Sequence, residues 1–172
     1  MTGWTSTAPE AVVLVATVGA ALIGLALIGM ALFRHVRRRY VVVVVVGTSM
    51  LPTYAPGDRV LVRWESGVPA RGDVVVVRKP DVSQGWPTVP ASSARGGPLG
   101  RRWLIKRVAA TGGDPWPEVV DPAAWDGGGE TVPVGHVVLL GDNPRGTDSR
   151  TWGPCPEHQV LGRAIRRMGP AE

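Results

Sequence analysis

The chain has 172 residues, of which 44% are hydrophobic and 19% are charged, and it contains 23 glycines and 16 prolines. This length allows one modest globular domain with a short additional segment, and the abundance of turn-forming residues favours a β protein over a helical bundle or a disordered chain. The formal net charge is +5. Outside one cluster the basic residues are spread among acidic ones, with no basic stripe between aromatic residues, so we predict no nucleic-acid binding.

An apolar segment at residues 11–33 contains no charged side chain. It is long enough to cross a bilayer as a helix. The segment begins after the acidic Glu10 and has its arginines at the far end, which is the reverse of a cleavable export signal. We therefore predict a short tail at 1–10 and a permanent single-pass anchor at 11–33, with the lipid bilayer as a partner.

A basic juxtamembrane segment at 34–40 follows the anchor and contains Arg34, Arg37, Arg38 and Arg39. Such a cluster is best interpreted as binding the membrane surface. By the positive-inside rule, these arginines would keep the C-terminal domain in the cytoplasm.

Beyond residue 40, short apolar runs alternate with turn signals such as Pro-Gly and Arg-Gly-Asp. The predicted strands are 41–46, 59–64, 73–78, 103–110, 136–140 and 160–168. Stretches 79–102 and 112–130 are rich in Pro and Gly and are predicted to be loop insertions, the first a surface loop or flexible insertion. Continuous apolar strands suit a sheet with both faces covered or a small barrel. We predict a mostly β domain over 41–168 and a C-terminal tail at 169–172.

The valine-rich run 41–46 leads directly to a single hydroxyl, Ser49, followed by Met50 and a proline. A serine becomes a good nucleophile only when a neighbouring base takes its proton. His35, His136 and His158 are possible bases, but none lies in a recognisable motif, and structural histidines are commoner. The lone thiol of Cys155 lies between prolines and can form no internal disulfide, so it is interpreted as a bystander.

Lysine is a second possible base, and the 19 basic residues include only two lysines, Lys79 and Lys106. Arginine does not lose its proton in a protein, whereas a desolvated lysine can. Lys79 precedes a proline in a turn, where water would keep it charged. Lys106 lies in the apolar run WLIKRV, where burial would lower its pKa and make it a competent general base. A charged edge-strand lysine that deters aggregation is the alternative, and Lys106 alone does not decide between the two.

Four sequence blocks together resemble the type I signal peptidases, in particular their short Gram-positive and organellar forms. They are Ser49-Met50-Leu51-Pro52-Thr53 with Gly57-Asp58, Arg71-Gly72-Asp73-Val74-Val75, Lys106-Arg107-Val108 with Gly113-Asp114, and Gly141-Asp142-Asn143 leading to Asp148-Ser149-Arg150. Their order and spacing behind a membrane anchor carry the resemblance, which runs from about residue 41 to 168.

The resemblance implies a membrane-bound serine protease with a Ser-Lys dyad on a coiled, barrel-like β fold. Ser49 would be the nucleophile, with its N–H binding the oxyanion, and Lys106 the general base. Asp148 and Arg150 would form an ion pair that braces the site, and Met50 would face the lipid or the substrate. Neither a metal nor an organic cofactor is implied.

This sequence departs from the family pattern at two positions near the site. Some members have a serine two residues before the nucleophile as a second oxyanion donor, where this chain has Gly47, so Thr48 is the candidate replacement. The stretch PRGT between Asn143 and Asp148 is one residue short, which makes Thr147 the candidate for the hydroxyl that orients the lysine amine.

The expected substrate is an extended segment of a signal-bearing precursor that pairs with strand 41–46 on one side and with residues 104–106 on the other. Small residues at the first and third positions before the cut, the A-x-A pattern, would fit shallow apolar pockets. The predicted substrate-binding residues are Val44, Val46, Met50, Leu104 and Ile105.

Several functional alternatives remain open. The resemblance places the catalytic domain outside the cytoplasm at the cell membrane, against the arginine count. If it faces inward, a maturation protease for one leader-bearing precursor is favoured. A self-cleaving repressor would need a DNA-binding segment in place of the anchor, and an inactive membrane-tethered peptide-binding module is the alternative of another class. The sequence does not indicate the oligomeric state.

Overall fold

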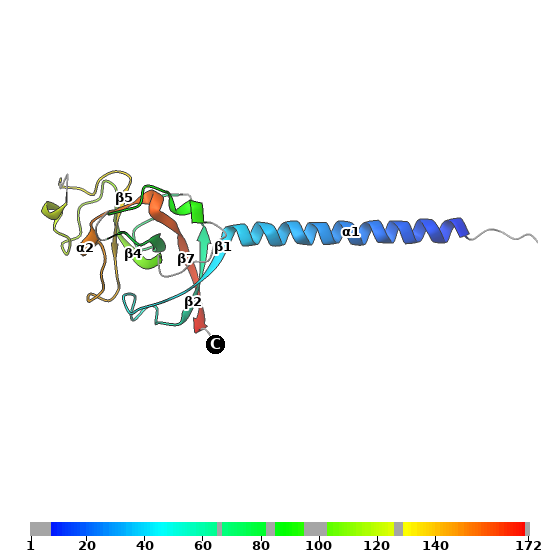
Figure 1. The fold of residues 1–172 in the computed structure, drawn as a ribbon, viewed down its shortest axis with the longest axis horizontal. Coiled ribbons are helices and arrows are strands. Elements are labelled where there is room, and N and C mark those ends of the chain that lie inside the picture. Colours follow the sequence, from blue (N-terminus) through cyan, green and yellow to red (C-terminus); the bar gives the residue numbers. More distant parts are fainter. Residues whose placement is uncertain (1–7, 65–66, 82–84, 95–102, 126–128, 171–172) are drawn as a thin grey trace, which may run out of the picture. The chain divides into compact units, whose positions relative to one another are not determined.

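The computed structural model describes all residues except 1–7, 65–66, 82–84, 95–102, 126–128 and 171–172. The chain divides into two units, Met1–Arg37 and Arg38–Glu172. The first contains most of a long helix, α1 (Ala8–Arg39), in which Val12–Arg37 is long and apolar enough to cross a membrane (Figure 1). Helix α1 continues through most of the basic segment predicted as juxtamembrane, because leucine, alanine and arginine all favour a helix.

The second unit contains seven strands in one antiparallel sheet of order β1-β2-β7-β3-β4-β5-β6. Their bounds are β1 Tyr40–Val44, β2 Asp58–Trp64, β3 Val74–Arg78, β4 Trp103–Thr111, β5 His136–Leu140, β6 Cys155–Pro156 and β7 Val160–Pro170. The mostly β fold and all six predicted strands are confirmed, although β1 ends two residues early and β7 runs two residues further. The short strand β6 and helix α2 (Ser149–Trp152) were not predicted.

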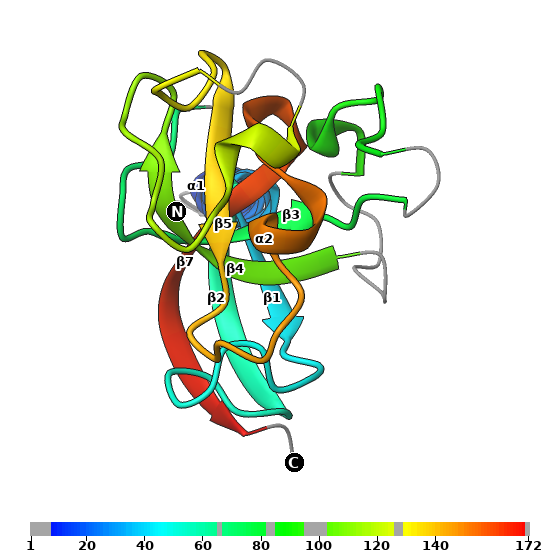
Figure 2. The same ribbon diagram turned by 90° about the vertical axis from the view of Figure 1, so that its left-hand side faces the viewer.

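The sheet curls into a half-barrel because its pairings contain bulges. Register shifts interrupt the β2–β7, β3–β7 and β4–β5 ladders, and each bulge bends its strand and adds twist. At Gly162 in β7 a Cβ atom would lie 2.2 Å from the Arg63 carbonyl oxygen, so only glycine permits this close crossing. Figure 2 shows the resulting curvature of β7.

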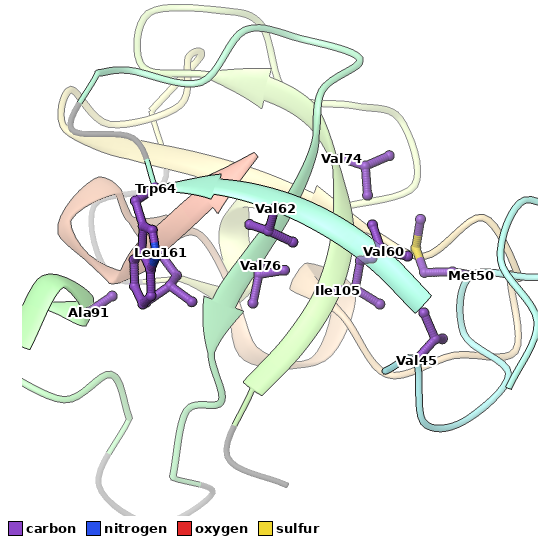
Figure 3. Packing of buried hydrophobic residues seen from close by; sticks show 10 residues of the cluster. All are labelled: Val45, Met50, Val60, Val62, Trp64, Val74, Val76, Ala91, Ile105 and Leu161. Atoms are coloured by element: carbon purple, nitrogen blue, oxygen red, sulfur yellow. The ribbon is translucent and has the colours of Figure 1, made fainter. Parts of the chain in front are cut away.

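Hydrophobic side chains cover both faces of the sheet, which explains why its strands are continuously apolar. In β3, Val74 and Val76 belong to one core cluster, while Val75 and Val77 belong to another. Figure 3 shows the first cluster, with Met50 beside Val60 at one end. Since alternate residues of a strand point to opposite faces, a strand buried on both faces loses the polar alternation of a half-exposed one.

Both predicted insertions contribute packed residues. In the described part of 79–102, Ala91 is fully buried in the first cluster, and Gln159 donates hydrogen bonds to the carbonyls of Pro87 and Val89. Within 112–130, Val120 helps to form a third cluster. Residues 85–90 are exposed or half-buried and lie outside the named strands and helices, as predicted for a surface loop, and these contacts hold that part of the loop on the domain. The remaining short helical turns are η1 (Ala91–Ala94), η2 (Pro122–Ala124) and η3 (Glu157–Gln159).

Candidate active site

Ser49 lies in a tight turn that follows the edge strand β1. Gly47, with φ of +91°, begins the turn in a conformation that glycine adopts readily. The Leu51 N–H then donates to the Thr48 carbonyl at 3.1 Å, and the Tyr54 N–H donates to the Met50 carbonyl at 2.8 Å. These bonds fix the backbone on both sides of the serine, whose side chain is half-buried.

The loop after β5 packs directly against this turn. The Asn143 N–H donates to the Ser49 carbonyl, and the Asn143 side-chain amide donates to the Thr48 carbonyl, both at 3.0 Å. Two glycines make the close approach possible. A Cβ atom on Gly141 would lie 2.5 Å from the Ser49 carbonyl oxygen, and one on Gly146 would lie 2.8 Å from the Ser49 Cβ atom. The loop thus contacts the serine so closely that neither glycine has room for a side chain.

Lys106 reaches the same place from β4. Its side chain is only 1% exposed and lies on the sheet face that also carries Val108 and the second core cluster. A Cβ atom on Gly141 would lie 3.4 Å from the Lys106 amine nitrogen as well as 2.5 Å from the Ser49 carbonyl oxygen. The Lys106 amine and the Ser49 backbone therefore both lie close to Gly141, although the two residues are far apart in the sequence.

The environment of Lys106 favours a neutral amine. Burial, the largest influence, lowers the pKa of Lys106 below its ordinary value of 10.5, whereas the carboxylates of Asp148 and Asp142 partly oppose this shift and the Arg150 guanidinium adds to it. Among the described residues Lys106 has no salt-bridge partner. An amine of this kind can accept a proton at a pH where an exposed lysine cannot.

Asp148 and Arg150 form the ion pair that the family resemblance implied. The Arg150 Nε and Nη2 atoms donate to the two Asp148 carboxylate oxygens at 2.8 and 2.7 Å, and the Gly141 N–H donates to the same carboxylate at 2.8 Å. These hydrogen bonds hold the pKa of the fully buried Asp148 below its usual value, although burial, the largest influence, opposes them. Asp148 also caps α2, so the pair fixes this helix to the loop beside Ser49.

A second carboxylate connects the serine turn to β4. Asp142 accepts two hydrogen bonds from the Arg107 guanidinium, at 2.8 and 2.7 Å, and a third from the Thr53 hydroxyl. A bidentate arginine–carboxylate pair is geometrically specific. The motif blocks contain Arg107, Asp142 and Thr53, but blocks separated by over 30 residues do not reveal which side chains meet, so no contact between these residues was predicted.

The structure separates the remaining predicted site residues into exposed and buried ones. Met50 is 0% exposed and packs in the first core cluster (Figure 3), so the expectation that it faces lipid or substrate is wrong. The turn directs the Met50 side chain into the core, where its long flexible thioether packs beside Val60. Ile105 is also buried in this cluster, which leaves only its main chain available to a substrate. Leu104 is half-buried, and Val44 and Val46 are exposed.

Thr48 and Thr147, the two candidate hydroxyl donors, are both exposed. In the part of the chain that the structure describes, no hydrogen bond joins Thr147 to Lys106. His136 lies near the Val134 carbonyl, at 3.2 Å from Nδ1. Burial raises the pKa of Cys155 above its usual value, as expected for an inert thiol.

Two stretches of main chain remain open for strand pairing beside the site. Strand β1 is the last strand at one end of the sheet, and within the described part of the chain it pairs only with β2. Strand β4 pairs with β3 through Trp103–Arg107 but with β5 only through Arg107–Thr111. Residues 103–106 therefore have no strand partner on the β5 side among the described residues, and both openings lie next to Ser49 or Lys106 in the sequence.

A serine in a rigid turn, with an almost fully buried lysine near it on a curled antiparallel sheet, is an arrangement suited to a serine peptidase. A family model described as signal peptidase, peptidase S26, matches residues 12–115 and 118–168. The chain belongs to this family and is a serine-type peptidase with an N-terminal membrane anchor.

Curated relatives cover most of the chain. It is 34% identical over 177 residues to the mitochondrial ATP-independent inner membrane protease subunit 1a of Arabidopsis thaliana, covering 98% of this chain and 90% of the relative. It is 33% identical over 143 residues to the human mitochondrial inner membrane protease subunit 1, covering 79% and 75%. It is 29% identical over 142 residues to the probable signal peptidase I-1 of Synechocystis, covering 72% and 68%.

Proposed function

We propose that the protein is a membrane-anchored endopeptidase that removes N-terminal signal or leader peptides from precursor proteins, with Ser49 as nucleophile and Lys106 as general base. The observation that carries the proposal is the buried Lys106 amine beside the Ser49 turn. The names of relatives such as signal peptidase I support the choice of substrate.

In the proposed reaction, the neutral Lys106 amine accepts the proton of the Ser49 hydroxyl as its oxygen attacks the scissile carbonyl carbon. The tetrahedral intermediate collapses, the C–N bond breaks, and the Lys106 ammonium returns the proton to the departing amine of the mature protein. A water molecule then hydrolyses the acyl-enzyme, with Lys106 again as base.

The oxyanion of this intermediate needs hydrogen-bond donors that are not already occupied. The structure records no hydrogen bond from the Ser49 N–H to any described residue, while Asn143 holds the Ser49 carbonyl and so orients the neighbouring peptides. The Ser49 N–H is therefore the proposed first donor. The exposed Thr48 hydroxyl is the proposed second donor, in place of the residue missing at Gly47.

The substrate would bind as an added strand between β1 and residues 103–106 of β4, since both have unpaired main chain facing away from their sheet partners. Val44, Val46 and Leu104 would contact its side chains. Shallow apolar surfaces of this kind suit small residues, and we propose an A-x-A preference before the cut.

Purified full-length chain in detergent is expected to cleave a precursor with an A-x-A site, and Ser49→Ala is expected to lower the rate by at least about 10³-fold, since nucleophile loss removes most of the acceleration. Mass spectrometry of the new N-terminus gives the cut position. Replacing the alanine immediately before the cut with leucine should also prevent cleavage there. The exposed Ser92→Ala is the matched control. Undiminished cleavage by Ser49→Ala would refute the assignment of Ser49 as nucleophile, whereas binding without cleavage by the unsubstituted chain would favour a peptide-binding module.

A second candidate is maturation of one or a few leader-bearing precursors. It is favoured by the relatives named as inner membrane protease subunits, three of which are 33–34% identical to this chain. Both candidates use the same site and differ only in how many precursors accumulate when the protein is depleted.

We propose that the catalytic domain lies outside the cytoplasm at the cell membrane, where exported precursors emerge. In spheroplasts that express a C-terminally tagged chain, external protease should then digest the tag without detergent. A cytoplasmic protein serves as the control for spheroplast integrity. Survival of the tag until detergent is added would place the domain inside, as the arginines after the anchor suggest, and would favour the maturation role.

A further inference from the structure

Helix α2 brings an aromatic ring to the Lys106 amine. The ring centroid of Trp152, the last residue of α2, lies 6.0 Å from the amine nitrogen. The Asp148–Arg150 pair fixes the start of the same helix, and the Ser149 hydroxyl accepts a hydrogen bond from the Leu139 N–H of β5 at 2.9 Å. Figure 2 shows α2 beside β5. The indole of Trp152 is thus held on a braced element.

A second tryptophan supports the first from a distant segment. Trp86, in the insertion between β3 and β4, makes an edge-to-face contact with Trp152, with ring centroids 5.6 Å apart and an interplanar angle of 76°. Such pairs are favourable beyond the area that they bury. The two hydrogen bonds from Gln159 to the carbonyls of Pro87 and Val89 hold this part of the insertion on the domain.

Aromatic packing, rather than hydrogen bonding, accounts for the position of Trp86. Its indole nitrogen is buried and has no hydrogen-bond partner among the described residues. A buried N–H without a partner is unfavourable, so the gain must come from the ring contacts with Trp152 and with the second core cluster.

The second insertion contacts the residue after α2. A Cβ atom on Gly153, which has φ of +72°, would lie 2.5 Å from the ring of Trp125. Tryptophans from both insertions therefore pack against the C-terminal end of α2, one on Trp152 and the other on Gly153.

We propose that Trp152, supported by Trp86 from the insertion, is a positioning residue that keeps water away from the Lys106 amine. The inference rests on the proposed function of Lys106 as base. It gives the insertion a role in the reaction, although the insertion contributes no reacting group.

The charged groups that face Lys106 determine what loss of the ring should do. Asp148 and Asp142 favour the ammonium, Arg150 opposes it, and burial is the largest influence keeping the amine neutral. Admitting water would therefore raise the pKa of Lys106 towards 10.5. A direct attraction between the ammonium and the ring would itself raise the pKa of Lys106, so its loss would lower that pKa. Because 6.0 Å is at the outer limit for such a contact, we expect the loss of shielding to dominate.

The scarcity of lysine makes a direct test possible. With Lys79→Arg as background, full-length chain in detergent micelles labelled with ¹³C at the lysine ε-carbon has one lysine signal, that of Lys106. The expected result is that Trp86→Ala and Trp152→Leu move its titration midpoint to higher pH. The acid limb of kcat against pH should move with it, so that kcat at pH 7 falls several-fold and recovers as the pH rises. Trp86→Phe keeps an aromatic ring at this position, so its Lys106 titration midpoint and its kcat at pH 7 should lie close to those of the unsubstituted protein.

Trp116→Ala is the matched control, because Trp116 packs against the third core cluster in the other insertion. A folded Trp86→Ala or Trp152→Leu variant whose Lys106 midpoint stays unchanged or falls would overturn the inference, as would an equal upward shift in Trp116→Ala. If Trp86→Ala does not fold, Trp152→Leu and Trp86→Phe provide the same comparison. Failure of the proposed function can be told apart from failure of this inference. If Lys106 is not the base, the titration midpoint of Lys106 in the unsubstituted protein would not coincide with the acid limb of kcat against pH.

Discussion

Replacing Lys106 with methionine is expected to abolish cleavage without lowering the stability of the fold. Methionine has a similar length and shape but no proton acceptor for the Ser49 hydroxyl, so kcat should fall by at least about 10³-fold. The methionine side chain suits a position that is only 1% exposed. The Asp148 carboxylate keeps its hydrogen bonds in this variant, because they come from Arg150 and the Gly141 N–H rather than from Lys106. Cleavage assays and denaturant unfolding measure the two effects separately.

The stability of this variant should also depend less on pH. The unfolded chain binds the lysine proton with the ordinary pKa of 10.5, whereas burial lowers the pKa in the folded chain. Below both values the folded protein must carry a buried ammonium, and its stability rises with pH between the folded and the unfolded pKa. Lys106→Met removes this contribution, so we expect its free energy of unfolding near pH 7 to be equal to or higher than that of the unsubstituted chain.

Two further variants control this experiment. Lys79→Met removes the other lysine and should leave activity unchanged. Lys106→Ala should also lose activity, but with a loss of stability near the roughly 2–5 kcal/mol typical of truncating a large buried side chain to alanine. Substantial activity in a folded Lys106→Met protein would contradict the assignment of Lys106 as the base.

Adding one methyl group at Gly146 is expected to lower kcat by about 10²-fold, because small displacements of a reacting group are enough to produce such losses. The new Cβ atom would lie 2.8 Å from the Ser49 Cβ, too close for both residues to keep their positions. The loop cannot easily retreat, since Arg150 donates a hydrogen bond to the Gly146 carbonyl at 3.2 Å and Asn143 is bonded to the Ser49 turn. We therefore expect the serine to move.

Steady-state kinetics of Gly146→Ala should show the loss mainly in kcat, because the openings along β1 and β4 are not altered. Gly67→Ala is the matched control, since a Cβ atom at Gly67 meets no heavy atom within 4 Å. A Gly146→Ala protein with the kcat of the unsubstituted chain would mean that the contact with Ser49 does not position the nucleophile.

The site combines segments that are distant in the sequence. The Ser49 turn follows β1, Lys106 lies in β4, and the loop after β5 provides the glycines and carboxylates that join them. Two fixed salt bridges, Asp148–Arg150 and Arg107–Asp142, both involve this loop. Its position therefore determines the approach of the lysine to the serine.

The sequence by itself determined the apolar anchor, the mostly β class and six of the seven strands. These features follow from local patterns, because an apolar segment of sufficient length and valine-rich runs between turn residues have few alternative structures. The two candidate reacting residues, Ser49 and Lys106, came from the resemblance carried by four sequence blocks, since the apolar surroundings of Lys106 alone did not decide its role.

The tertiary structure alone decided how side chains are distributed around the site. Met50 follows the serine directly and was expected to be accessible, yet the turn buries it completely. The contacts of Gly146 with Ser49, of Asp142 with Arg107, and of Trp86 with Trp152 join segments that no local pattern connects. They arise because bulges curl the sheet and bring the loops against it, and that curvature depends on long-range strand pairing rather than on the preference of any single residue.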